Sequence, residues 1–339
     1  MIRLVAIELL AIIVFCGVLP AALLHLLMKA FAKRPFMLRK NYAGREVPLG
    51  LGFVWPLWGV GVAVLALLSR LQVFRNALAA LILPNLGVFL LLIAIAVLAV
   101  FAFGLIDDIG GVGTSKGFRG HLKALARGKL TTGAVKLFGI GITALVLART
   151  LFLWGLFGLD GLISVRWLFG LLLLGGSIAL CANFINLCDL RPGRASKTTI
   201  LLLVIGFLFL PGAYVEVAGK YMFWQSLAQG LLSKLPLFLA LLLPVLITLR
   251  SDLREQGMLG DAGANPAGFI AGVYLAMWLS GNLVGLAIFF LIMLALNLAS
   301  EKFSFTQVIE RNPLLSRLDR IGRIKTGDKS RKEEHTDTC

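Results

Sequence analysis

Three clusters of acidic and polar residues stand out in a chain that is otherwise mostly apolar. The first is the pair Asp107 and Asp108, which directly follows an apolar run. The second comprises Asn183, Asn186 and Asp189, whose three-residue spacing puts successive polar groups near one face of a helix. Carboxylates this close to hydrocarbon are costly unless they are paired, bind a metal or take part in function. These two clusters also have structural interpretations: the first as water-facing acids at a helix end, the second as asparagines that hydrogen-bond between helices.

The third cluster is a flexible glycine-rich loop that extends from residue 259 to 266. It contains Asp261 between Gly260 and Gly263, and its last residue, Pro266, is suited to the first turn of a following helix. Such a loop can bring backbone N–H groups to a phosphate while the aspartate reaches a metal ion. Taken alone, this short motif is a weak signal.

A basic loop follows Asp189 and precedes the next apolar run. It contains Arg191 and Arg194, and guanidinium groups and helix N-termini both suit phosphate oxygens. The clusters thus combine hard oxygen donors with phosphate-suited groups, and no cluster of thiolates or imidazoles accompanies them. Hard oxygen donors favour magnesium over zinc, so magnesium is the expected cofactor.

Composition places these clusters in a membrane protein. Hydrophobic residues make up 59% of the 339 residues, whereas soluble domains contain roughly half or less. A bilayer crossing needs ~20 mostly apolar residues, and such runs must be helical because unpaired backbone groups are costly in hydrocarbon. We therefore predict an all-α, polytopic transmembrane helical bundle with about nine to ten spans. Nine can be placed, at residues 4–28, 48–69, 84–106, 134–154, 166–187, 198–215, 235–250, 266–281 and 283–300.

The charges predict how this bundle is oriented. When the loops are assigned alternately to the two sides, 26 of the 33 Lys and Arg residues fall on one side. The positive-inside rule makes that side cytosolic, with the N-terminus outside and the acid clusters inside. The net charge of +16 then reflects topology and attraction to anionic lipids rather than a nucleic-acid partner. The expected organisation is a transmembrane domain over 1–303, a cytosolic segment over 304–324 and a disordered polar tail over 325–339.

Five motifs occur in order over about residues 40–300: GLIDDIGG, KGFRGHLKAL, GKLTTGAVK, NFINLCDLRPGRA and MLGDAGANPAGF. They resemble the cytosolic motifs of the polyprenyl-phosphate N-acetylhexosamine-1-phosphate transferases, a superfamily that includes the phospho-N-acetylmuramoyl-pentapeptide transferases. The resemblance implies a magnesium-dependent enzyme of the bacterial inner membrane. In such an enzyme the phosphate of undecaprenyl or another polyprenyl phosphate attacks the β-phosphate of a UDP-amino sugar and releases UMP. The product would serve cell-envelope polysaccharide or peptidoglycan synthesis.

The resemblance also assigns roles to residues. Asp107, Asp108 and Asp261 match the catalytic acids, and they are the expected magnesium ligands. With the arguments from residue type, it gives a substrate-binding set of Asn183, Asn186, Asp189, Arg191, Arg194, Gly260, Gly263 and Lys116. The expected partners are polyprenyl phosphate and a UDP-amino sugar, while the identity of the sugar and the formation of a homodimer stay open.

The chain departs from the pentapeptide transferases in several places. Pro192 stands where those enzymes have a further aspartate, and glycines replace a basic residue expected soon after the aspartate pair. A histidine-rich final loop is absent too, since the histidines are His25, His121 and His335. One alternative is therefore a non-catalytic relative that binds polyprenyl phosphate or a nucleotide sugar. Another is a transporter, although transporters place polar groups near the bilayer midplane and the acids here sit at span ends.

Overall fold

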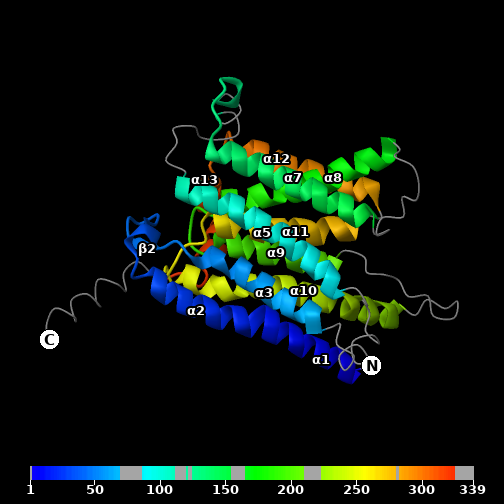
Figure 1. Cartoon of the computed structure of the whole chain (residues 1–339). Coiled ribbons are helices and arrows are strands. Elements are labelled where there is room, and N and C mark those ends of the chain that lie inside the picture. Colours follow the sequence, from blue (N-terminus) through cyan, green and yellow to red (C-terminus); the bar gives the residue numbers. More distant parts are fainter. Residues whose placement is uncertain are drawn as a thin grey trace.

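The computed structural model describes residues 2–68, 86–110, 120, 124–153, 165–209, 223–279 and 282–324, so the tail expected at 325–339 lies outside it. The described chain is nearly all helical, and Figure 1 shows its long helices side by side in one bundle. The first span is a single helix in which a π-helical turn, Ile13–Val18, joins α1 (Ile2–Ile12) to α2 (Leu19–Phe31). The later helices are α3 (Val54–Leu68), α5 (Leu86–Gly110), α7 (Thr132–Leu153), α8 (Val165–Cys188), α9 (Arg194–Phe209), α10 (Phe223–Leu253), α11 (Asp261–Leu279), α12 (Leu283–Ser300), α13 (Phe305–Arg311) and α14 (Pro313–Arg320).

Seven of the described helices are long and apolar enough to cross a membrane. They comprise Ala6–Phe31, Leu51–Leu68, Leu86–Gly110, Thr132–Leu151, Val165–Cys188, Lys234–Leu253 and Leu283–Ser300. The prediction of a helical membrane protein is thereby supported, but the count of nine to ten spans is not confirmed. The two remaining expected spans, 198–215 and 266–281, overlap α9 and α11, which are not among these seven. That they cross the membrane stays a prediction.

Helix α11 is the innermost helix of the bundle. Every residue from Ala262 to Ala276 is buried, and the helix packs against α5, α8 and α9. Gly268 allows a close approach to α8, because an added Cβ there would lie 2.5 Å from the carbonyl oxygen of Cys181. Small residues at such contacts let helices in lipid pack closely without a hydrophobic driving force. The polar groups at the start of α11 are therefore held by neighbouring helices.

The start of α11 corrects the expected loop over residues 259–266. The helix begins at Asp261, so Pro266 lies inside it rather than in its first turn. The backbone N–H groups of Asp261 and Ala262 donate to the two carboxylate oxygens of Asp108, each at 2.9 Å. Gly260 has φ +62°, a left-handed conformation that favours glycine, and turns the chain into the helix. The loop prediction was wrong because the acceptor that starts this helix comes from α5.

One hairpin departs from the all-α prediction. Strands β1 (Leu38–Lys40) and β2 (Glu46–Pro48) pair antiparallel at one end of the bundle (Figure 1). The hairpin holds Glu255, a non-glycine residue with φ 54°, in the turn after α10. Arg45 forms an ion pair with this carboxylate at 2.8 Å, and the Asn41 amide donates to it at 2.9 Å. These contacts fix a turn that precedes α11.

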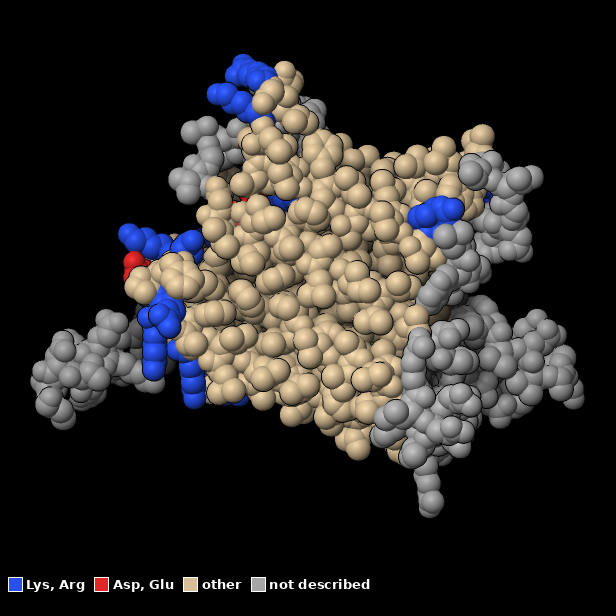
Figure 2. Space-filling model, in the orientation of Figure 1, with Lys and Arg blue, Asp and Glu red and all other residues tan. Residues whose placement is uncertain are grey.

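The basic residues gather at the end of the bundle that carries the hairpin. Figure 2 shows this concentration of Lys and Arg on the left, where Figure 1 places β2 and α13, and fewer of them among the described residues at the other end of this face. The observed asymmetry agrees with the charge split in the sequence. The assignment of this end to the cytosol stays a prediction.

Gly104 sets the distance between α5 and the start of α11. A methyl group at Gly104 would lie 2.5 Å from the carbonyl oxygen of Asp261. We expect Gly104→Ala to destabilise the protein by roughly 1–3 kcal/mol, the usual cost of overpacking, and to lower its melting temperature in detergent. The matched control is Gly141→Ala in α7, where an added Cβ meets nothing within 4 Å. Equal melting temperatures for the two variants would contradict the close approach.

Candidate functional site

Two of the predicted catalytic aspartates meet at one lysine. Asp107 lies in the last turn of α5, Lys136 near the start of α7, and Asp261 opens α11. The Lys136 ammonium lies 2.7 Å from the Asp107 carboxylate and also forms an ion pair with Asp261. The side chain of Lys136 is 13% exposed, that of Asp107 16% and that of Asp261 25%. The cluster is therefore largely shielded from solvent but open to a small ligand. Three helices thus bring these charges together at the end of the bundle.

Asp108 has a different environment from its neighbour. Both of its carboxylate oxygens accept backbone N–H groups at the start of α11. A carboxylate at a helix N-terminus satisfies free N–H groups and interacts favourably with the helix dipole. Gly260 packs against this carboxylate, since an added Cβ there would lie 2.8 Å from its Oδ2. The structure therefore gives Asp108 a positioning role beside its predicted catalytic role.

The cluster contains more negative than positive charge. Burial raises the pKa of Asp261 to about 7, the positive charge of Lys136 opposes this rise, and Asp107 and Asp108 add to it. Three carboxylates face one ammonium here, and charges in a poorly solvated site interact strongly. A further cation bound at this end of α11 would balance the excess.

Magnesium is the cation that the sequence predicts. Among the residues that the structure describes, no group of three or more His, Cys, Asp or Glu side chains is arranged to hold a metal ion. Magnesium, however, is commonly bound through one or two carboxylates, with water and substrate phosphates completing its octahedron. Asp107 and Asp261 fit that smaller set, because their carboxylates already converge on one cationic atom. The two oxygens of Asp108 are engaged by the backbone.

A cavity of about 410 Å³ adjoins the cluster between α7, α8 and α12. Its polar part includes Lys136, Asn183 and Asn186, and the Asn183 amide donates to the side-chain oxygen of Asn297 at 2.6 Å. Asn297, Ser300 and Glu301 also line it. The rest of the lining is apolar apart from Gly133, with Leu137, Ile140, Ala179, Leu180, Leu187, Leu294 and Leu298. Lys136 therefore borders both the carboxylate cluster and an apolar cavity.

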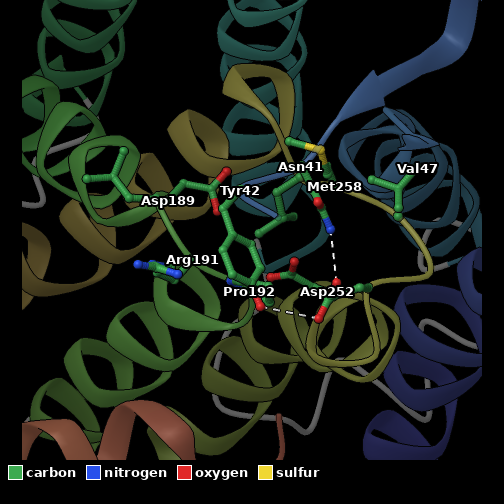
Figure 3. A pocket seen from close by; sticks show the side chains of 12 residues that line it. Asn41, Tyr42, Val47, Asp189, Arg191, Pro192, Asp252 and Met258 are labelled. Atoms are coloured by element: carbon green, nitrogen blue, oxygen red, sulfur yellow. Dashed lines mark hydrogen bonds between the residues drawn. The ribbon is translucent and has the colours of Figure 1, made fainter. Parts of the chain in front are cut away.

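Asp189 faces another pocket instead. Figure 3 shows Asn41, Tyr42, Asp189 and Asp252 around this small opening, whose volume is about 50 Å³. Burial raises the pKa of Asp189 well above its ordinary value, and the charge of Asp252 raises it further. The structure thus divides the predicted Asn183, Asn186 and Asp189 cluster between two cavities, although all three lie at the same end of the bundle.

The two predicted phosphate-binding arginines already have partners within the chain. Arg191 lies over the ring of Tyr42, 4.7 Å from its centroid, and forms a 3.3 Å ion pair with the exposed carboxylate of Glu310. Arg194 is only 5% exposed, and two of its nitrogens each lie 3.1 Å from an oxygen of Asp319. Phosphate binding by these arginines stays a prediction, and at Arg194 it requires displacement of a carboxylate.

The remaining predicted substrate-binding residues are two glycines and a lysine. Gly260 and Gly263 have packing roles. An added Cβ at Gly263 would collide with Leu259, and the carbonyl of Gly263 accepts a hydrogen bond from the Trp55 indole at 2.9 Å. These roles account for the glycines without a ligand, so substrate binding by them stays a prediction. Lys116 lies outside the described residues.

Sequence reasoning missed three residues of this region. Lys136 lies in the motif GKLTTGAVK, but its sequence position indicates only a topology-determining charge. Asn297 is an asparagine within the otherwise apolar α12, which is a usable signal because polar groups in spans are costly. Asp319 gave no local signal, since its partner Arg194 is 125 residues away.

Comparison with known proteins adds no family assignment. No protein-family model matches the chain, and no curated protein matches it. The resemblance to the polyprenyl-phosphate transferases therefore depends on the ordered motifs, and the functional argument depends on the site.

The positioning role of Asp108 can be tested by removing its charge. Asp108→Asn leaves one oxygen to accept two N–H groups and loses the interaction with the helix dipole. We expect a loss of about 1–3 kcal/mol of stability, as for a buried donor left unsatisfied, measured as a lower melting temperature in detergent. Glu46→Gln, at an exposed residue of β2, is the control and should melt like the parent. A parental melting temperature for Asp108→Asn would argue against this role.

Proposed function

We propose that the chain is a membrane transferase that moves a phospho-amino-sugar from a UDP-amino sugar to a polyprenyl phosphate and releases UMP. The observation that carries this proposal is the convergence of the Asp107 and Asp261 carboxylates on Lys136, beside an apolar cavity. Phosphoryl transfer mainly requires neutralisation of charge and alignment of nucleophile with leaving group. Carboxylates, a cationic side chain and a lipid-compatible cavity at one end of a membrane bundle supply these requirements together.

The cavity between α7, α8 and α12 suits a lipid phosphate. Its leucine-rich lining would contact the first isoprene units, while Lys136, Asn183 and Asn186 at its polar part would face the phosphate. At 410 Å³, it is far too small for a whole polyprenyl chain, whose remainder would lie in the bilayer. The lipid phosphate would then lie next to the carboxylate cluster.

The reaction forms one phosphorus–oxygen bond and breaks another. An oxygen of the lipid phosphate attacks the β-phosphorus of the UDP-amino sugar, and the bond from that phosphorus to the bridging oxygen breaks, so UMP leaves with the oxygen. A phosphate monoester is mostly ionised at neutral pH, with a second pKa of about 6, so the attack needs no protein base. In this proposal Lys136 would neutralise phosphate charge, and Asp107 and Asp261 would hold a magnesium ion. When bound, magnesium would supply the additional positive charge that the transferred phosphoryl group requires.

A second candidate is a non-catalytic protein that binds a polyprenyl phosphate or a nucleotide sugar. The observation that favours it is the pairing of Lys136 with both carboxylates, together with that of Arg194 with Asp319. These ion pairs give the lysine and the arginine carboxylate partners without any ligand. Ligand binding without UMP release would select this candidate.

The test is UMP release by purified protein supplied with undecaprenyl phosphate, magnesium and a panel of UDP-amino sugars. Release should depend on both the lipid and the metal. Asp261→Asn removes one carboxylate from the proposed magnesium site and should lower the rate by at least ~10²-fold, the usual effect of removing one electrostatic contact in a transition state. The same change removes the ion pair with Lys136, but Lys136 keeps its pair with Asp107 and the repulsion from Asp107 is relieved, so the melting temperature should not fall.

The control for this measurement is Glu46→Gln, which removes a carboxylate at the same end of the bundle without touching the site. It should release UMP at the parental rate. Parental activity of Asp261→Asn, or full activity of the parent in excess chelator, would refute the metal assignment. No UMP release by the parent with any sugar of the panel would refute the transferase.

The proposal also requires the site to face the cytosol of a bacterial cell, where nucleotide sugars are made. Arg254→Cys, at an exposed position near the site, should resist an impermeant thiol reagent added to intact cells, whereas Val165→Cys at the opposite end should be labelled. The parent for both is Cys339→Ser, because Cys16, Cys181 and Cys188 are buried. The reverse labelling pattern would invert the orientation.

A further inference from the structure

The C-terminal segment, residues 304–324, lies against the ends of several membrane helices. It follows α12 after a short connection, and the ring of Phe305 packs edge-on against Phe184 in α8, with 6.0 Å between centroids. At its far end Gly322 lies against Leu253, the last residue of α10. Since α8, α10 and α12 are candidate membrane spans, the segment lies at the level where those helices leave the apolar layer.

One side of this segment is fastened to the loop that follows α8. The Asp319 carboxylate pairs with Arg194 and, at 2.7 Å, with Arg323, which also donates to the carbonyl of Pro192 at 2.9 Å. Lys197 donates to the backbone carbonyl of Asp319 at 2.7 Å. Burial acts to raise the pKa of Asp319, but the hydrogen bond from Arg194 and the surrounding positive charges outweigh burial and lower it. The carboxylate is therefore ionised at neutral pH and holds the loop.

The other sides of α14 are largely exposed. Leu314 and Leu318 are 67% and 51% exposed. Successive helical residues are rotated by about 100°, so Leu318, Asp319 and Arg320 point in three directions. The aspartate faces the protein, the leucine lies on an apolar side, and the arginine lies on a basic side. Such a helix, close to the ends of membrane spans, has the pattern of an interfacial amphipathic helix.

We infer that residues 304–324 bind the anionic headgroup layer of the surrounding bilayer and, through Asp319, hold the loop at Pro192 and Arg194 in place. The exposed leucines would enter the boundary between headgroups and acyl chains. The arginines of the segment, Arg311, Arg317 and Arg320, would contact anionic lipid phosphates. A bilayer is the favoured occupant because the apolar side is rimmed by these arginines and adjoins helices that cross the bilayer.

The experiment places an environment-sensitive fluorophore on a cysteine at position 318 or 320 of the full chain, in the Cys339→Ser parent. The protein is reconstituted in nanodiscs of phosphatidylcholine with or without phosphatidylglycerol, and some lipids carry brominated acyl chains. The probe in Leu318→Cys should be quenched by the brominated lipid several-fold more than the probe in Arg320→Cys. Replacing Arg311 and Arg317 with glutamine should weaken the preference of residues 304–324 for bilayers that contain phosphatidylglycerol, by about fivefold for each arginine.

Equal quenching at the two positions would overturn the inference. So would a probe at position 318 that is shielded from water yet unquenched by brominated lipid, since a second copy or another protein would then cover this side. The readout needs no turnover, so its failure is distinct from a failure of the proposed transferase.

The contact between Asp319 and the loop at Pro192 and Arg194 can be tested with a matched pair of variants. Asp319→Asn removes a carboxylate whose side chain is 10% exposed. Glu310→Gln removes one that is 55% exposed and forms a longer ion pair, at 3.3 Å, with Arg191. Trypsin should cut after Arg320 and Arg323 faster in Asp319→Asn than in the parent, and at the parental rate in Glu310→Gln. Equal cleavage of all three proteins would show that Asp319 does not hold the segment.

Discussion

The first turn of α11 lies at the end of the helix bundle and is largely shielded from solvent, so its backbone N–H groups need acceptors from the protein. Asp108 satisfies two of them with one carboxylate, and this contact joins the end of α5 to the start of α11. Gly104 permits the approach because no side chain separates the two helices there. Because Asp261 is the first residue of the same turn, its carboxylate is positioned by the contact that starts the helix. Neighbouring aspartates in α5 thus have separate tasks, one toward the backbone and one toward Lys136.

Lys136 connects two regions with opposite physical character. On one side lie the carboxylates of Asp107 and Asp261, and on the other lies a cavity lined mainly by leucines. An amphiphile with a charged head and an apolar tail fits such a boundary, because each part meets a matching surface. The ion pairs also keep the lysine charged and oriented when no ligand is bound. A site of this kind is preorganised, and a ligand's binding energy is then not consumed in ordering the lysine.

The sequence predicted the helices much better than the contacts between them. Apolar runs predicted a helix at each of the nine proposed spans, because hydrocarbon demands continuous backbone hydrogen bonding over a known length. They did not predict the start of α11, since glycine and proline between 260 and 266 indicate a loop unless a distant carboxylate caps the helix. Asp107, Asp108 and Asp261 could be selected from sequence because acids near apolar runs are unusual. Lys136 could not, because a lysine at the start of a span ordinarily sets topology. Its pairing with Asp261, like that of Arg194 with Asp319, joins residues 125 positions apart.

The buried pair between Arg194 and Asp319 has a consequence for competition between anions. A guanidinium that pairs with a carboxylate of its own chain faces a competitor that cannot diffuse away. Tethered groups of this kind act at effective concentrations on the order of millimolar. A phosphate present at micromolar concentration would leave the pair intact in most molecules unless the arginine bound it about a thousandfold more tightly than it binds the carboxylate. Asp319 therefore sets an affinity threshold that any anion recognised by Arg194 has to exceed.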